Sequence, residues 1–183
     1  MHEDAHPAEI TGSCLCGKIN YRFNTAGMRF INNCHCRNCQ KHSGAAFVSS
    51  LHVDPDVFAW LDGEELIKHY ASSPEVQRAF CADCGSRVPQ QQPDDVVVPM
   101  AGLDEPLNLA PQVDIWADQK LPWLTIDPAR PACRGRGTPE FWAKLMGGDV
   151  ETYRTLQQEL DERQNQLRRS ATHNSQPKEQ GQL

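Results

Sequence analysis

The chain has 183 residues, 23% of them charged, and a formal net charge of −6. No stretch approaches the roughly 20 consecutive apolar residues of a membrane-spanning helix, and residues 1–9 lack the apolar core of a signal peptide, so we expect a cytoplasmic protein that binds no membrane. Residues 1–133 carry 10 Lys and Arg against 17 Asp and Glu, and residues 134–183 carry 8 against 7, a balance that argues against nucleic-acid binding, which usually needs a basic face.

Short apolar runs separated by turn residues occupy most of residues 10–120. In residues 18–23 the pattern alternates and places Ile19, Tyr21 and Phe23 on one face, as in a half-buried strand. No helical periodicity is evident before residue 138, so we expect a mainly β fold. Further strands are expected over residues 28–33, 46–53, 65–70, 76–80, 96–100 and 112–116.

The C-terminal part is predicted to be a helical tail. Thr138 can cap a short helix that has Pro139 at its first position. Gly147 and Gly148 end this helix, and Asp149 can cap a second helix that runs to about residue 169. The second helix has too few apolar heptads for a coiled-coil dimer, which favours a helix on the domain surface. The predicted organisation is a flexible N-terminus over residues 1–9, a main domain over 10–133, a helical extension over 134–169 and a disordered tail over 170–183.

Seven of the eight cysteines form three tight clusters. In a cytoplasmic chain, clustered cysteines are more often metal ligands than disulfides. A Cys-x-Cys pair on a strand turns both thiols to one face, and a Cys-x-x-Cys turn brings two sulfurs to one point, with Gly85, and by analogy Gly17, suited to positive φ. Two such pairs complete a tetrahedral Cys₄ zinc site of the structural type. The residues of this predicted site are Cys14, Cys16, Cys81 and Cys84.

The remaining cluster, Cys34, Cys36 and Cys39, can occupy three corners of a second zinc tetrahedron. No clustered cysteine is left for the fourth corner, which is then open to water or substrate. The alternative is a second structural site that Cys133 or a histidine closes. His35 is expected to support the ligands or lie on the surface rather than bind metal. His42 and Ser43 are expected as polar loop residues, with lining of the open site as the alternative.

A zinc ion held by three thiolates is a weak Lewis acid toward water and a good partner for another sulfur. A thiol that binds to it loses its proton and is held as a thiolate. The pattern therefore favours the forming or breaking of a carbon–sulfur bond over hydrolysis. Arg37 and Lys41 flank the triplet and are the local candidates for binding the carboxylates of an anionic thiol.

The cysteine motifs and their neighbours resemble those of the glutathione-dependent formaldehyde-activating enzyme family, which also contains centromere protein V. The similarity covers roughly residues 10–127. The Arg87–Val88 pair and Asp114 depart from the family pattern, which often has an apolar pair and a histidine there, and the tail from Arg134 lies outside it. The matching segments are 12–21 (GSCLCGKINY), 34–40 (CHCRNCQ), 43–47 (SGAAF), 80–86 (FCADCGS) and 111–116 (PQVDIW) with Pro122–Trp123.

The resemblance implies small, curled antiparallel sheets organised around two zinc ions. It assigns Cys14, Cys16, Cys81 and Cys84 to a structural zinc, and it assigns Cys34, Cys36 and Cys39 to a catalytic zinc. The implied activity is that of a carbon–sulfur lyase that forms or cleaves S-hydroxymethylglutathione, with glutathione or a similar small thiol and an aldehyde as partners. The main alternative is a non-enzymatic, zinc-stabilised protein-interaction module. A filament-binding or metal-buffering protein is a further alternative, and no motif indicates the oligomeric state.

Overall fold

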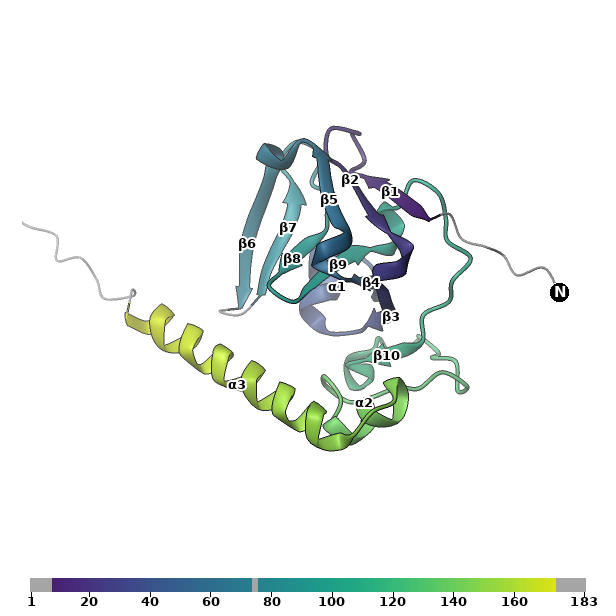
Figure 1. Ribbon diagram of the computed structural model, residues 1–183, viewed down its shortest axis with the longest axis vertical. Coiled ribbons are helices and arrows are strands. Elements are labelled where there is room, and N and C mark those ends of the chain that lie inside the picture. The colour runs from purple at the N-terminus through teal and green to yellow at the C-terminus, as the bar shows by residue number, and fades with distance from the viewer. Residues whose placement is uncertain (1–7, 74–75, 174–183) are drawn as a thin grey trace, which may run out of the picture. The chain divides into compact units, whose positions relative to one another are not determined.

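The computed structural model describes residues 8–73 and 76–173 (Figure 1). Contacts divide the chain into two compact units. One holds the described residues up to Tyr70 together with Arg78–Gly137, and the other holds the described parts of Ala71–Gln77 and Thr138–Leu183. The elements are β1 Glu9–Ser13, β2 Asn20–Asn24, β3 Met28–Cys34, α1 Arg37–Ser43, β4 Val48–Val53, β5 Phe58–Asp62, β6 Ile67–Ser73, β7 Val76–Cys81, β8 Gln90–Gln92, β9 Asp95–Pro99, β10 Val113–Ile115, α2 Pro139–Met146 and α3 Val150–His173.

The strands form three small sheets, which confirms the mainly β prediction. One sheet has the order β1-β2-β5, a second has the order β10-β3-β4-β9-β8, and β6 pairs with β7. The expected antiparallel pairing does not hold throughout, because β10 runs parallel to β3 and places Ile115 opposite Cys34. This parallel pair brings the end of the matching segments next to the first cysteine of the triplet.

The main core lies between the two larger sheets. The alternation predicted over residues 18–23 is confirmed, since Ile19, Tyr21 and Phe23 are almost fully buried. Tyr21 also donates its hydroxyl to the carbonyl of Gly102 at 2.8 Å, which satisfies its buried polar end. A second, smaller cluster around Ile19 contains two of the motif cysteines. The main core consists of Ile10, Tyr21, Phe23, Ile31, Leu51, Val53, Val96 and Val98, and the smaller one of Cys14, Ile19, Ala79, Cys81 and Val88.

The helix α1 corrects the expectation that no helix precedes residue 138. It has seven residues, fewer than two turns, so no apolar periodicity could reveal it. Cys36 caps its first turn, with Sγ accepting a hydrogen bond from the backbone N–H of Cys39 at 3.3 Å. Gly44, at φ +68°, ends it in the left-handed conformation that glycine adopts without strain. The residues that cap its two ends therefore define this helix, rather than an apolar face along it. Strands β1, β5 and β8 also lie outside the expected set.

The C-terminal caps are confirmed. Thr138 Oγ1 accepts from the N–H of Phe141 at 3.3 Å, and Asp149 Oδ1 accepts from the N–H of Glu151 at 2.7 Å. The second helix runs to His173, four residues past its expected end. Leu156 and Leu160 on it are 48% and 45% exposed. The expected flexible N-terminus and disordered tail lie largely outside the described residues, although Glu9 belongs to β1 and residues 170–173 belong to α3.

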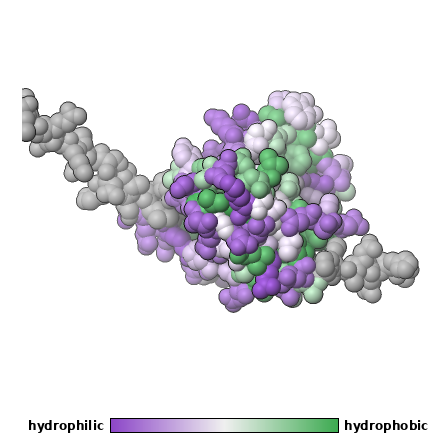
Figure 2. All heavy atoms as spheres, turned by 90° about the horizontal axis from the view of Figure 1, so that it is seen from above, coloured by the Kyte–Doolittle hydropathy of each residue, from purple (hydrophilic) through white to green (hydrophobic). Residues whose placement is uncertain are grey.

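Apolar and polar side chains mix on the outside of the molecule. On the face shown in Figure 2, small hydrophobic patches alternate with hydrophilic ones. Single exposed apolar residues of this kind are normal on globular proteins. Among the described residues, no helix combines the length and apolarity needed to cross a membrane.

Gly63 between β5 and β6 should tolerate no side chain. It has φ +75°, and a Cβ there would lie 2.1 Å from the backbone oxygen of Lys18. We expect Gly63→Ala to lower the free energy of unfolding by about 2 kcal/mol or more, because left-handed strain and a backbone clash add. Gly135→Ala is the control, since Gly135 has φ +55° but open space around it, and it should cost about 1 kcal/mol. Denaturant unfolding of the metal-loaded protein measures both, and equal costs would contradict the clash.

Candidate metal centres

The four cysteines of the predicted structural site come together. Their sulfur atoms all lie within 4.8 Å of one another. The Cys14 and Cys16 sulfurs are 3.4 Å apart, and those of Cys16 and Cys81 are 3.8 Å apart. A tetrahedral Zn²⁺ with Zn–S bonds of about 2.3 Å places its sulfurs about 3.8 Å apart. The donor set and its spacing therefore fit a closed zinc site, with the fourth sulfur supplied by Cys84.

Two similar turns build this cluster. The N–H of Gly17 donates to the carbonyl of Cys14 at 2.8 Å, and the N–H of Gly85 donates to the carbonyl of Cys81 at 2.9 Å. Both glycines have positive φ, +73° and +74°, as their place in the motifs predicted. The N–H of Ile19 also donates to Cys14 Sγ at 3.3 Å. Such N–H groups stabilise a thiolate, so the local backbone suits charged sulfur ligands.

The triplet forms a second cluster at the junction of β3 and α1. The Cys34, Cys36 and Cys39 sulfurs lie within 4.8 Å of one another. Over the part of the chain that the structure describes, no further His, Cys, Asp or Glu joins this group. Cys133 lies elsewhere, with its sulfur 3.9 Å from the carbonyl oxygen of Gly135. The three sulfurs thus fit three corners of a zinc tetrahedron, and the closing ligands considered from the sequence do not reach the fourth within the described residues.

Two arginines that the sequence did not single out for the site lie beside the triplet. Arg78, on β7, directs its Nη1 to Cys39 Sγ at 3.5 Å. Burial lowers the pKa of Arg87, while its attraction to the thiols of the triplet acts in the opposite direction. Arg87 is held in place by the closed cluster, because it follows the Cys84 turn and its backbone bridges to Phe80. In the sequence, the one feature that could have drawn attention to Arg87 as a site residue was its departure from the family pattern.

Arg37 and Lys41 occupy different surroundings from these two arginines. Both side chains are exposed on α1. Arg37 donates from Nη1 to Oε1 of Gln40, and its backbone N–H donates to Oε1 of Gln119 at 2.9 Å. Neither Arg37 nor Lys41 lines the cavity described below. Arg37 and Lys41 are therefore close to the triplet along the chain but do not lie at the cavity. Their role in substrate binding stays a prediction.

A buried polar network supports the triplet from behind. His35 and Asp114 are each 1% exposed, and His35 Nε2 lies 2.6 Å from Asp114 Oδ1. Asn33 donates to the same oxygen at 3.2 Å, and Arg130 Nη1 donates to Asp114 Oδ2 at 3.2 Å. His35 thus lies between two candidate ligands but belongs to the support behind them. Arg130 balances the buried carboxylate from a segment that follows β10.

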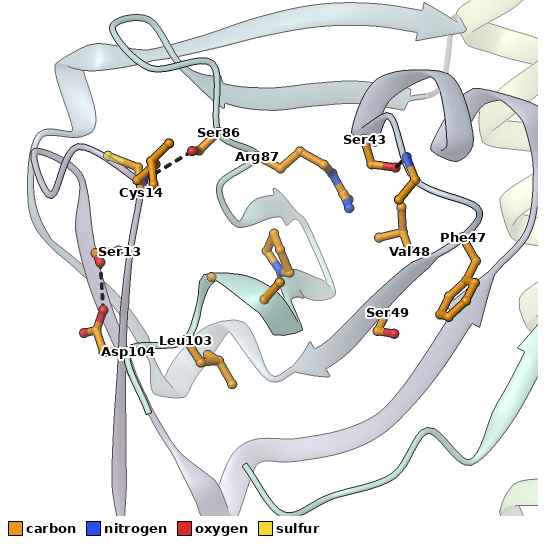
Figure 3. Close-up of a pocket in the computed structure, with 15 residues that line it drawn as sticks. Ser13, Cys14, Ser43, Phe47, Val48, Ser49, Ser86, Arg87, Leu103 and Asp104 are labelled. Atoms are coloured by element: carbon orange, nitrogen blue, oxygen red, sulfur yellow. Dashed lines mark hydrogen bonds between the residues drawn. The ribbon is translucent and has the colours of Figure 1, made fainter. Parts of the chain in front are cut away.

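A cavity of about 660 Å³ is lined by residues of the closed-cluster turns, such as Cys14 and Ser86, and by residues close in the fold to the triplet, such as Ser43 and Val48, but by none of the triplet cysteines. Figure 3 shows the Arg87 side chain pointing into it, with Ser43 and Val48 on one side and Ser13 and Asp104 on the other. Ser43 ends α1, the helix that contains Cys39, and Val48 pairs with Cys34 across β3 and β4, so the cavity wall includes one element of the triplet and the strand next to another. The structure therefore places Ser43 at the cavity, the alternative considered for it. The full lining is Ser13, Cys14, Leu15, Ser43, Ala45, Phe47, Val48, Ser49, Ser86, Arg87, Pro99, Ala101, Gly102, Leu103 and Asp104.

A family model and one relative point to the same family. The family model described as glutathione-dependent formaldehyde-activating enzyme matches residues 9–119. A Halomonas elongata protein, whose name assigns it provisionally as such an enzyme, is 27% identical over 128 residues, which are 64% of this chain and 81% of that protein. A crystal structure of a Rhodobacter sphaeroides protein is similar with a TM-score of 0.43 and 19% identity, over 54% of this chain and 92% of the other.

Proposed function

Because this chain belongs to the glutathione-dependent formaldehyde-activating enzyme family, we propose that it is a zinc-dependent carbon–sulfur lyase. The proposed reaction forms or cleaves S-hydroxymethylglutathione or a similar adduct of a small thiol and an aldehyde. The observation that carries this proposal is a three-sulfur cluster that no fourth donor joins among the described residues. A cavity of about 660 Å³, whose wall includes Ser43 on the helix that contains Cys39, offers space for a ligand. We also propose a cytoplasmic location, where glutathione is present in its reduced form.

The two clusters are proposed to have different roles. Cys14, Cys16, Cys81 and Cys84 would hold a structural zinc, and Cys34, Cys36 and Cys39 would hold a catalytic one. When bound at the triplet, zinc would stabilise an added thiol as its thiolate. The thiol sulfur then forms a bond to the aldehyde carbon, while the carbonyl π pair moves to oxygen, which takes up a proton from solvent. The reverse reaction breaks the same carbon–sulfur bond and returns the proton.

The chain's own residues hold the triplet in shape. Ser43 Oγ donates to the carbonyl of Cys39 at 2.9 Å, and Gln40 Nε2 donates to the carbonyl of Gln119 at 3.0 Å. Arg78 offers a positive charge to Cys39 Sγ. Charge-assisted contacts of this kind favour a thiolate over a thiol. A hydrogen bond with Cys34 and the charge of Arg78 lower the pKa of the Cys39 thiol, whereas the hydrogen bond with Cys36 and burial raise it above its usual value overall. We infer that these groups orient Cys39 as a ligand and that bound zinc would supply its deprotonation.

Exchange spectroscopy tests the proposed activity. Glutathione and formaldehyde interconvert with their adduct without a catalyst, so NMR exchange at equilibrium measures the rate that the protein adds. We expect metal-loaded protein to raise the exchange rate about tenfold or more at micromolar concentration, and Cys36→Ser to abolish the increase. An unchanged rate with both metals bound would contradict a lyase. Glutathione binding in the millimolar range by calorimetry, without faster exchange, would favour a thiol-binding or interaction module instead.

A further inference from the structure

Among the described residues, the guanidinium of Arg87 makes no hydrogen bond or salt bridge, and the charges that act on it are those of the triplet thiols and of Arg78. Arg87 is partly buried and lines the cavity of about 660 Å³. A guanidinium has five N–H donors, and it is costly to bury them without acceptors. Figure 3 shows this side chain extended from the turn after Ser86 into the cavity. The unfilled donors therefore face the space in which a ligand would lie.

The charges nearby do not account for Arg87. Three thiolates and one divalent cation leave a single negative charge at the triplet, and Arg78 is the cation hydrogen-bonded to it, through Cys39 Sγ. Arg78 and Arg87 also oppose each other's charge. The positive charge of a second arginine is thus more than the metal-loaded triplet needs for charge balance. An anionic group of a bound ligand would neutralise this additional charge.

The rest of the cavity wall gives a ligand its orientation. Among the described lining residues, Arg87 is the one cation, and Asp104 is the one anion apart from Cys14, a proposed ligand of the closed zinc site. Asp104 accepts a hydrogen bond from Ser13 Oγ at 2.7 Å, and Figure 3 shows this pair across the cavity from Arg87. An anionic group is repelled from the Asp104 side and attracted to the Arg87 side, which is the side of the triplet.

We propose that Arg87 is a specificity-determining residue that binds a carboxylate of the thiol substrate. The cavity then selects thiols that carry a carboxylate within reach of the sulfur, and Arg87 fixes that carboxylate by paired N–H···O bonds. This inference rests on the proposed thiol chemistry of the triplet. It is specific to this chain, because Arg87 stands where the family pattern often has an apolar residue. The competing role for Arg87 is to balance the charge of a metal-held thiolate. In that role, the affinity for a thiol would not depend on whether the thiol carries a carboxylate.

N-acetylcysteine and its amide separate these two roles, because they differ only in the carboxylate. Calorimetry on the full-length, metal-loaded protein gives both dissociation constants without requiring catalysis. We expect the acid to bind about tenfold to a hundredfold more tightly than the amide, as for a charge-assisted pair. Arg87→Gln should reduce that ratio to about one and leave the affinity for the amide nearly unchanged. Arg87→Lys should keep part of the preference, because a lysine retains the charge but not the paired geometry.

Arg22→Gln is the matched control, because Arg22 is an exposed arginine that pairs with Glu9 outside the cavity. It should leave both constants unchanged. Equal binding of acid and amide by the wild-type protein overturns the proposal, as does an equal loss for both ligands in Arg87→Gln. A preference that disappears in Arg37→Gln instead would assign the carboxylate to Arg37. Absence of binding by either thiol would remove the proposed thiol chemistry itself, and the role of Arg87 with it.

Discussion

Replacing Cys81 with serine should leave the chain unfolded at 25 °C, whereas replacing Cys39 with serine should leave it folded and inactive. Cys81 is fully buried in the smaller core with Ile19 and Val88. A structural zinc site contributes about 10–16 kcal/mol of folding free energy, which matches or exceeds the total stability of about 5–15 kcal/mol typical of a domain. Far-UV circular dichroism and zinc counting by mass spectrometry measure the difference. We expect two zinc ions in the wild type and one in Cys39→Ser.

The polar contacts that join the two turns of the closed cluster are weak, so we expect the bound metal to supply most of the stability there. Lys18 pairs with Asp83 at 2.6 Å, but both side chains are substantially exposed, and exposed pairs contribute about 0–1 kcal/mol. The N–H of Leu15 also donates to Ser86 Oγ at 3.2 Å. Without metal, four thiols would crowd together, and the two segments would be joined by these polar contacts and by the smaller core around Ile19 and Val88.

Cys133→Ser provides the control for this pair of variants. Cys133 is buried but belongs to neither cluster. Its replacement should cost about 1–2 kcal/mol for burying a hydroxyl and should keep both zinc ions. A Cys81→Ser protein that melts like the wild type, or a Cys39→Ser protein that unfolds as completely as Cys81→Ser, would contradict the division of roles.

The grouping of the cysteines could be predicted from the sequence because its causes are local. A Cys-x-Cys strand and a Cys-x-x-Cys turn each direct two sulfurs to one point, whatever the rest of the fold does. Gly17 and Gly85 take the positive φ that these turns require. The alternating strand around Tyr21 is similarly local. These features needed no knowledge of long-range contacts.

The role of Arg87 could not be predicted in the same way. Arginine in a loop is usually solvated, and almost fifty residues separate Arg87 from Cys39 in the chain. Only the fold places this guanidinium within electrostatic reach of the triplet. Sequence proximity instead favoured Arg37 and Lys41, whose side chains are exposed on α1 and do not line the cavity. Neighbours in the chain are poor guides to a site that several elements build.

The position of Asp114 illustrates a third case, in which a departure from the family pattern was visible but its compensation was not. Asp114 is on β10, and the balancing Arg130 comes from a segment beyond residues 9–119, the part that the family model matches. That segment is tied to β10 by backbone bonds from Asp114 N–H to the carbonyl of Pro131 and from Cys133 N–H to the carbonyl of Asp114, both 2.9 Å. Asp114 and the segment that contains Arg130 are thus connected by both side-chain and backbone hydrogen bonds.

Arg130→Met should therefore destabilise the protein by about 3 kcal/mol, because it leaves a carboxylate buried without its cation. Asp114 is 1% exposed, while the Arg130 side chain is 24% exposed. Most of the cost thus comes from Asp114 rather than from lost packing of Arg130. Denaturant unfolding of the zinc-loaded protein measures the change. Arg134→Met, at an exposed arginine four residues further on, is the control and should stay within about 0.5 kcal/mol of the wild type.

The double variant Asp114→Asn/Arg130→Met distinguishes a charged network from a neutral one. The amide oxygen of an asparagine can still accept the hydrogen bonds from His35 and Asn33, and it leaves no buried charge. If the carboxylate is ionised in the fold, the double variant should be more stable than Arg130→Met alone, by about 1–2 kcal/mol. If the single variant costs under about 1 kcal/mol and the double variant recovers nothing, Asp114 is already neutral and Arg130 is no counter-ion. The support behind Cys34 and Cys36 would then be a set of neutral hydrogen bonds, and the segment after residue 119 would contribute to it through its backbone alone.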